Sequence, residues 1–294
     1  KKETQRDIND WGSEGYQGYL NRNCVTIAEV LKENGYHTYM AGKWHLGMHG
    51  QKKWPLQRGF ERFYGILAGA ASYLRPEGGR GLTLDNEHLP APEAPYYTTD
   101  AFTDHALQFV GEQKDDKPFF LYLAFNAPHW PLQAKEEDIQ KFTKLYRSKG
   151  WDKIRQERYN RMQKMGIIDK NVGFAEWENR SWDELTEKEK DESAYRMAVY
   201  AAQVHCVDYN VGKVIDYLKK TKQLDNTLIL FLADNGACAE PYLELGGGKQ
   251  EDINNPACNN MPSYGRAWAQ TSNTPFRKYK CLSLIHISEP TRPY

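Results

Sequence analysis

The chain has 294 residues, with 39 basic and 39 acidic side chains, so its formal net charge at pH 7 is zero. This balance argues against nucleic acid as the main partner, because surfaces that bind nucleic acid are strongly basic. No apolar run is long enough to span a bilayer, so we expect no membrane partner. The length suffices for one large domain or two modest ones with a sizeable core.

The cysteines are irregularly spaced and form no Cys-x-x-Cys pair. They are Cys24, Cys206, Cys238, Cys258 and Cys281. This spacing indicates neither a zinc site nor a disulfide framework. The 19 tyrosines and 8 tryptophans suit a surface that faces carbohydrate, but they are equally typical of a large aromatic core.

The first part of the chain predicts helices alternating with strands. Residues 1–23 are polar and are predicted to form a loop. Residues 25–34 predict a short helix, which ends before Gly35; its buried stripe would contain Ile27, Val30 and Leu31, with Ala28 between them. A strand over 36–41 follows, residues 82–89 predict a hairpin or an edge strand, and residues 99–113 predict a second helix.

The second part continues this alternation. Residues 118–125 are continuously apolar and predict a strand buried on both faces. Residues 135–193 are charged and mostly helical in period, which indicates an insertion or a solvated helical layer. A long helix is predicted over 195–220 and a second buried strand over 226–233, whereas residues 252–275 are loop-like. The whole pattern predicts an α/β domain with a mostly parallel central sheet and helices on both faces.

Polar side chains follow three of the predicted strands. They are Lys43 and His45, then Asn126 and His129, then Asp234 and Asn235. The carboxyl ends of strands in an open α/β sheet form one functional crevice, so we expect these side chains to converge. Each pair alone has a plain explanation: Lys-x-His can be a surface pair in a glycine-rich turn, and Asp-Asn-Gly can be a hairpin turn.

The residue types indicate chemistry on an oxyanion. If residues 43–45 are extended, Lys43 and His45 point to the same face, where the lysine can hold negative charge and the histidine can move a proton. Asp234 and Asn235 supply hard oxygen ligands, which suit Ca²⁺ or Mg²⁺ better than zinc. Two such ligands do not complete a calcium site, so further ligands must come from elsewhere. No Gly-x-Ser-x-Gly motif and no cysteine with a partner supplies an activated nucleophile.

Four ordered motifs resemble the type I sulfatases of the alkaline-phosphatase-like superfamily. They are residues 26–31 with Gly42-Lys43-Trp44-His45-Leu46-Gly47, then residues 126–132, then Leu232-Ala233-Asp234-Asn235-Gly236, and the lead-in to Lys280 over 272–280. The similarity extends from about Gly15 to Lys280. It implies an alkaline-phosphatase-like α/β fold, here incomplete, and a sulfuric ester hydrolase as the parent enzyme.

The resemblance also implies a role for each matching residue. Lys43, His45 and His129 would be catalytic; Lys280, Lys43 and His129 would bind the substrate; and Asp234 and Asn235 would bind a divalent cation, Ca²⁺ or alternatively Mg²⁺. Within this set, His45 would assist sulfate release as a base, and His129 would contact the bridging oxygen. The partner would be a sulfated small molecule or glycan.

The family's nucleophile is a formylglycine, made from Cys or Ser in a Cys/Ser-x-Pro/Ala-x-Arg motif upstream of the lysine-histidine signature. That motif is absent upstream of Lys43: Cys24 lacks the proline or alanine two positions later and the arginine four positions later. The upstream aspartate pair that completes the family's metal site is missing too. We therefore expect residues 1–280 to be a partial catalytic domain that lacks its nucleophile segment and C-terminal region and is inactive alone. The parent would need a formylglycine-generating or anaerobic maturation enzyme and would be periplasmic or extracellular. Residues 281–294 resemble a translated sequencing adapter, so we expect a non-native tail.

Two alternatives stay open. A phosphodiesterase or phosphonate monoester hydrolase of the same superfamily would share the metal and histidine chemistry. A non-catalytic protein on the same scaffold could instead bind sulfated glycans.

Overall fold

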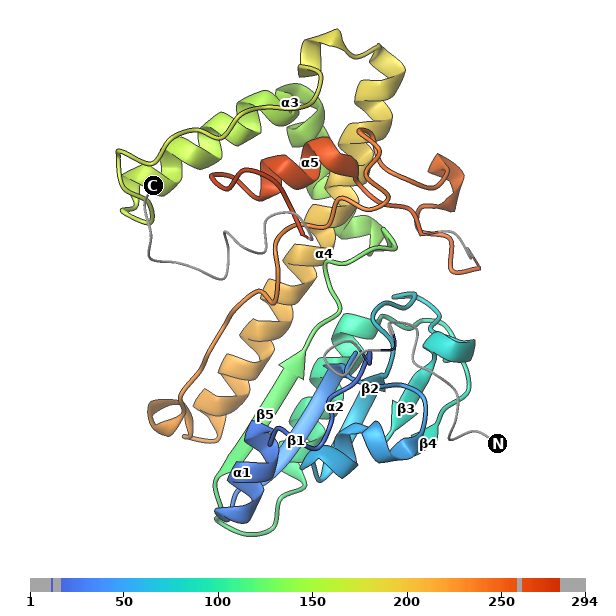
Figure 1. Ribbon diagram of the computed structural model, residues 1–294, viewed down its shortest axis with the longest axis vertical. Helices are drawn as coiled ribbons and strands as arrows, with labels where there is room; N and C mark the ends of the chain where they lie inside the picture. The colour runs from blue at the N-terminus through green and yellow to red at the C-terminus, as the bar shows by residue number, and fades with distance from the viewer. Residues whose placement is uncertain (1–11, 13–16, 258–260, 281–294) are drawn as a thin grey trace. The chain divides into compact units, whose positions relative to one another are not determined.

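The computed structural model describes residues 12, 17–257 and 261–280, and the chain divides into two compact units (Figure 1). Unit 1 comprises the chain through Pro128 together with residues 206–226, and unit 2 comprises residues 129–205 and the chain from Thr227 onward. The stretch that we expect to be a non-native tail, residues 281–294, lies outside the described residues, as does most of the predicted loop over 1–23.

Unit 1 contains a five-stranded mixed sheet of order β4-β3-β2-β1-β5 (Figure 1). The strands β2 (Arg62–Ile66), β1 (His37–Lys43) and β5 (Phe119–Ala124) run parallel. An antiparallel hairpin of β3 (Leu82–Leu84) and β4 (Glu87–His88) extends this sheet beyond β2. The α/β class is therefore confirmed, together with the strands predicted over 36–41 and 118–125 and the hairpin over 82–89. The predicted burial of the strand over 118–125 on both faces is wrong, because β5 lies at the edge of this sheet and its Tyr122 is 46% exposed.

Helices cover both faces of this sheet, because successive strand side chains point to opposite faces. On one face, Tyr39 and Ala41 of β1 pack with Phe102 and Phe109 of α2 (Thr98–Gly111). On the other face, Met40 packs in a cluster with Ala28 of α1 (Ile27–Glu33). The predicted helices over 25–34 and 99–113 are thus confirmed as the two flanking layers.

The predicted buried stripe of α1 is wrong. Ala28 is fully buried, whereas Ile27 is 62% exposed and Val30 is 44% exposed. Because Ala28 has the smallest side chain of the apolar set, it allows the helix backbone to approach the sheet closely. Periodicity identified the apolar side chains of α1 but not which of them the sheet would cover.

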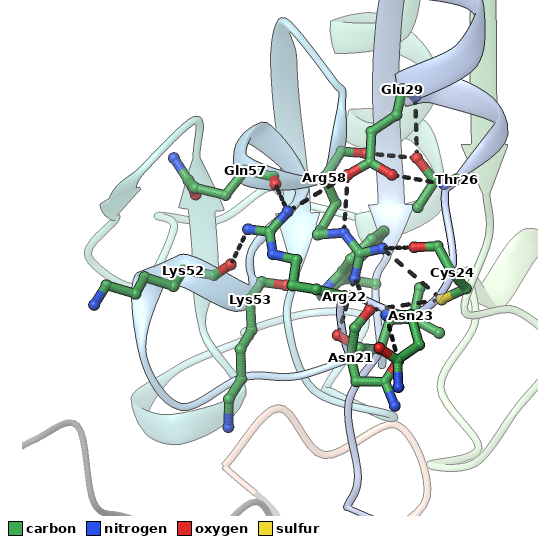
Figure 2. Close-up of polar contacts among 12 residues, drawn as sticks. Asn21, Arg22, Asn23, Cys24, Thr26, Glu29, Lys52, Lys53, Gln57 and Arg58 are labelled. Atoms are coloured by element: carbon green, nitrogen blue, oxygen red, sulfur yellow. Dashed lines mark hydrogen bonds and ion pairs between the residues drawn. The ribbon is translucent and has the colours of Figure 1, made fainter. Parts of the chain in front are cut away.

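Arg58 anchors the segment that precedes α1 (Figure 2). Its side chain is 1% exposed and lies at the end of the short 3₁₀ helix η2 (Pro55–Arg58). The guanidinium donates from Nε to Glu29 Oε1 at 3.1 Å and from its Nη atoms to the carbonyls of Leu20 and Cys24, each at 2.9 Å. With the carbonyl of Asn21, which accepts at 3.2 Å, one buried cation therefore holds four backbone or carboxylate acceptors. Two further 3₁₀ turns, η1 (Gln51–Lys53) and η3 (Gly78–Arg80), complete the connections around the sheet.

Unit 2 is built from helices. These are α3 (Glu136–Lys164), the first part of α4 (Glu187–Lys220) and α5 (Gly265–Ser272), with 3₁₀ turns η4 (Trp182–Glu184) and η6 (Gln250–Asp252); η5 (Leu224–Asn226) follows α4 in unit 1. Gly150 interrupts α3 with a φ of 64°. The helix α5 corrects the expectation that residues 252–275 form only loops.

The charged block over 135–193 is not merely a solvated layer, because it contributes much of the core of unit 2. The rings of Trp151 and Trp182 meet edge to face with centroids 4.9 Å apart, and Trp268 of α5 lies 5.7 Å from Trp151 in a similar arrangement. Trp151 and Trp268 are fully buried. Burial of such large aromatic surfaces compensates for the low hydrophobicity of the surrounding sequence.

The buried strand predicted over 226–233 is wrong. These residues are assigned to no strand, and the side chains of Leu228 and Phe231 are 84% and 77% exposed. No strand in the described part of the chain pairs with them. Among the described helices, none combines the length and the apolar character required to cross a membrane.

Candidate functional site

Lys43 is the last residue of β1 and pairs with Ile66 of the neighbouring parallel strand. The preceding residue, Gly42, has a φ of 123°, and a Cβ at this position would collide with the carbonyl of Ala124 on β5. Only glycine tolerates this backbone conformation and this close approach together. The sequence Gly-Lys therefore fixes where Lys43 leaves the sheet.

His45 does not continue the strand. Its φ is 53°, in the left-handed region, while its backbone N–H still donates to the carbonyl of Leu67 at 3.2 Å. The alternation that would place Lys43 and His45 on one face therefore does not extend to His45. The imidazole lies against Gly69, where a Cβ would collide with the ring. Sequence reasoning missed Gly69, although its place in the small-residue run 68–71 was an available signal.

Asn126 follows β5 in unit 1 and is 3% exposed. Its backbone carbonyl accepts a hydrogen bond from the hydroxyl of Tyr73 at 3.0 Å. Its side-chain Oδ1 meets no hydrogen-bond donor within the part of the chain that the structure describes. Buried amide oxygens in proteins usually accept a hydrogen bond, so the Oδ1 of Asn126 marks this strand end as unusual.

His129 and Lys280 form the best-defined polar pair in unit 2. Lys280 Nζ lies 3.3 Å from His129 Nε2, and His129 Nδ1 lies 3.0 Å from the carbonyl of Trp130. Because a carbonyl can only accept, Nδ1 carries the proton and donates it. Nε2 then has the lone pair and accepts a hydrogen bond from the Lys280 ammonium group.

The backbone around Lys280 is held by specific hydrogen bonds. The N–H of Lys280 donates to the carbonyl of Ala237 at 2.8 Å. The buried Asn273 donates from Nδ2 to the carbonyl of Lys278 at 2.8 Å, and its Oδ1 accepts from the N–H of Ala237 at 3.4 Å. The segment after Asp234-Asn235 and the segment that ends at Lys280 are therefore joined side by side, although they are far apart in the sequence.

The two predicted metal ligands stand just before this junction. The side chain of Asp234 is exposed and that of Asn235 is half-buried. Asn235 donates from Nδ2 to the carbonyl of Gly236 at 2.8 Å, so its Oδ1 faces away from that contact. An oriented amide oxygen next to a carboxylate is a donor set that fits a hard divalent cation.

Two further polar side chains lie beside His129, and sequence reasoning missed both. Donor atoms of His129, Cys238 and Glu240 all lie within 4.8 Å of one another. Burial raises the pKa of the Cys238 thiol and the charge of the Glu240 carboxylate adds to this, while the backbone N–H of Glu240, the charge of Lys280 and the indole of Trp130 act in the opposite direction. The sequence placed Cys238 four residues after Asp234 but gave no sign that His129 would be its neighbour.

The structure thus joins His129 and Lys280 directly and places Asp234 and Asn235 on the segment next to Lys280. Lys43 and His45 belong to unit 1. Convergence of all six predicted residues in one pocket stays a prediction.

A family model described as Sulfatase matches residues 4–278 of the chain. An uncharacterized sulfatase of Schizosaccharomyces pombe is 36% identical over 300 residues, which cover 92% of this chain and 53% of that protein. An arylsulfatase of Klebsiella aerogenes is 32% identical over 284 residues, which cover 91% of this chain and 61% of the enzyme. A crystal structure of Ps i-CgsB in complex with k-i-k-neocarrahexaose is 30% identical, with a TM-score of 0.51 over 74% of this chain and 41% of that one. The chain therefore spans little more than half the length of these curated relatives.

Proposed function

The chain belongs to the sulfatase family, and on that premise we propose that it forms part of an enzyme that hydrolyses sulfate esters. The observation that carries this proposal is the hydrogen bond between Lys280 and His129, at 3.3 Å. It places a fixed cation and a proton carrier within reach of a single small group. A sulfate ester needs both, since negative charge on its oxygens must be neutralised and its leaving oxygen must be protonated.

In this proposal Lys280 holds a sulfate oxygen, and Lys43 has the same role. Before substrate binds, the lone pair of His129 Nε2 accepts from Lys280 Nζ. When Lys280 turns its hydrogen bond to a sulfate oxygen, Nε2 becomes able to carry the proton for the leaving oxygen. The Nδ1–H bond to the carbonyl of Trp130 keeps the ring oriented throughout. His45 is the second proton carrier.

A divalent cation fits the donors that the chain supplies. Asp234 and the Oδ1 of Asn235 would hold it, and when bound it would neutralise charge on the sulfate group. Calcium takes six to eight oxygen ligands and magnesium six, so this pair is only part of either coordination sphere. We propose Ca²⁺, with Mg²⁺ as the alternative.

The nucleophile of the proposed reaction is a formylglycine, which no residue before Lys43 can supply. We therefore propose that the 294-residue chain alone does not turn over. A Ser-x-Pro-x-Arg sequence does occur once, at residues 288–292, in the C-terminal stretch outside the described residues. It follows the lysine-histidine signature instead of preceding it, and we assign it no role.

Two relatives indicate the substrate class. One is named an arylsulfatase, and the structural neighbour is bound to a hexaose. The neighbour bound to a hexaose resembles this chain in both sequence, at 30% identity, and structure. We therefore propose a sulfated saccharide as the natural substrate and an aryl sulfate as a convenient test substrate.

The test compares this chain with the product of the complete gene that encodes it, each co-expressed with a formylglycine-generating enzyme. Hydrolysis of an aryl sulfate and of an aryl phosphate is measured with added calcium and after chelation. We expect the complete protein to hydrolyse the sulfate in a metal-dependent manner and this chain to hydrolyse neither ester. Faster hydrolysis of the phosphate would favour a phosphodiesterase or phosphonate hydrolase. Sulfated-glycan binding without turnover by the complete protein would favour the non-catalytic alternative.

A further inference from the structure

Three side chains of unit 2 bring nitrogen, sulfur and oxygen donors to one place. The ligand atoms of His129, Cys238 and Glu240 all lie within 4.8 Å of one another. Mixed sets of imidazole, thiolate and carboxylate are typical of Zn²⁺ sites, whereas calcium and magnesium sites use oxygen ligands. We propose that these three side chains bind Zn²⁺, at a site distinct from the Asp234-Asn235 pair.

The geometry requires only a small contraction. In tetrahedral zinc sites with bonds of 2.0–2.3 Å, ligand atoms lie roughly 3.5 Å apart, so the donors need to approach one another by at most about 1.3 Å. Cys238 and Glu240 are two residues apart on one segment that belongs to no helix or strand, which allows this adjustment. Three protein ligands leave the fourth position of the metal for water or another ligand.

The surroundings of His129 suit metal binding. Metal-bound histidines usually donate their second ring N–H to a carbonyl or carboxylate, which fixes the ring and raises the basicity of the ligating nitrogen. His129 already makes this contact, because Nδ1 lies 3.0 Å from the carbonyl of Trp130. Nε2 is therefore the nitrogen left to bind the metal.

Cys238 would bind zinc as a thiolate. Burial and the charge of the Glu240 carboxylate raise the pKa of the free thiol, whereas the backbone N–H of Glu240, the charge of Lys280 and the indole of Trp130 act in the opposite direction. Zinc binding would break the S–H bond, form the Zn–S bond and release one proton to solvent.

A pocket gives the ion a route to this cluster. Its volume is about 600 Å³, and its lining includes Trp130, Glu240 and Tyr242. Because Glu240 lines the pocket and belongs to the ligand set, a hydrated ion can reach its carboxylate from this pocket.

Lys280 competes with the metal. Its Nζ lies 3.3 Å from the same Nε2 that zinc would use, so the ammonium group and the ion exclude each other. If the proposed function holds, bound zinc would remove both His129 and Lys280 from the reaction and would inhibit it. The binding site itself does not depend on that function.

The test uses the 294-residue chain and a Co²⁺ titration, since cobalt reports thiolate ligation through a charge-transfer absorbance band; Zn²⁺ affinity follows by competition. We expect one ion per chain with this band. Cys238→Ser should abolish the band and weaken zinc binding at least about tenfold, and Glu240→Gln should weaken it in the same direction. Lys280→Met should tighten binding, because it removes the competing cation. Cys24→Ser, at an exposed cysteine of unit 1, is the matched control and should change nothing.

Circular dichroism verifies that each variant is folded. A band that survives Cys238→Ser, a band that Cys24→Ser removes, or the absence of any band in the unsubstituted chain would each overturn the zinc site. Unchanged or weaker affinity in Lys280→Met would overturn the competition. None of these readings uses sulfate ester hydrolysis, so they stand whether or not the proposed activity is found.

Discussion

Lys280 Nζ donates to His129 Nε2 across 3.3 Å, although 151 positions separate the two residues. In the complete protein, we expect His129→Ala and Lys280→Met each to lower kcat for an aryl sulfate by about 10²–10³-fold. The loss in the double variant should be smaller than the product of the two single losses, because both residues act on the same bound sulfate ester. Steady-state kinetics of the three variants measure this coupling. Fully multiplicative losses would show that the two residues act independently.

The exposed carboxylate of Asp234 and the oriented amide of Asn235 give a second prediction. Asp234→Ala in the complete protein should abolish the dependence of activity on added calcium and leave at most about 1% of kcat, since the cation loses its charged ligand. The measurement is activity against calcium concentration after chelation. Glu251→Ala, which changes an exposed acidic residue elsewhere in unit 2, is the control and should retain the calcium dependence. Retained calcium dependence in Asp234→Ala would assign the metal to other residues.

The sheet of unit 1 was predictable because its strands carry their own signals. β5 is a continuously apolar segment bounded by turn residues, β1 follows Gly35 at the end of the first helix, and the hairpin after Leu82 is bounded by glycines and a proline. These are local properties of the chain, so they survive without knowledge of the neighbours. The glycine at position 42 is also a local signal, because the positive φ there requires this residue type.

The errors arise where a neighbour decides the outcome. The segment around Leu228 and Phe231 has the composition of a buried strand, yet strand formation needs a hydrogen-bonding partner, and the described strands supply none. The site shows the same division. The polar residues Lys43, His129 and Asp234 were identifiable from motifs, whereas the positions of Gly69 and Cys238 next to a histidine follow from tertiary contacts that periodicity does not encode.

The buried cation of unit 1 predicts a large loss of stability. Arg58→Met should destabilise the chain by about 3 kcal/mol, because Glu29 and three backbone carbonyls lose a common donor. Arg62→Met is the matched control, since Arg62 pairs with the partly exposed Asp85 and Glu112, and should cost about 1 kcal/mol or less. Urea unfolding followed by tryptophan fluorescence compares the two variants. Equal losses would mean that burial of the guanidinium does not matter.

The close approach of β1 to β5 predicts that Gly42 cannot be replaced. Gly42→Ala should destabilise the chain by at least about 2 kcal/mol, because the added Cβ meets both the unfavourable φ and the carbonyl of Ala124. Gly79→Ala is the control, since a Cβ there meets no atom within 4 Å, and should change the stability by about 0.5 kcal/mol or less. Thermal unfolding of both variants tests this, and a stable Gly42→Ala variant would show that the strands can move apart.

His37 predicts a pH dependence of the stability of unit 1. Both ring nitrogens face carboxylate oxygens at 2.8 Å, Glu61 on Nδ1 and Asp115 on Nε2, so the ring donates to both only as an imidazolium. Hydrogen bonds from Glu61 first and Asp115 second raise the pKa of His37 above 6.5. Lys32, 4.0 Å from Glu61, and Lys117, 3.5 Å from Asp115, partly offset this negative charge.

A folded-state pKa above the unfolded value of 6.5 gives the sign of the effect. The stabilisation is fully present below pH 6.5 and is lost as the pH rises through the raised pKa, because the folded state then releases the proton that it had held more tightly. The free energy of unfolding should therefore fall between pH 6.5 and the raised pKa. His37→Gln should remove this pH dependence and leave the sheet folded. An NMR titration of the His37 ring gives the pKa directly. A value at or below 6.5 would contradict the bridge, because neither carboxylate would then favour the charged ring.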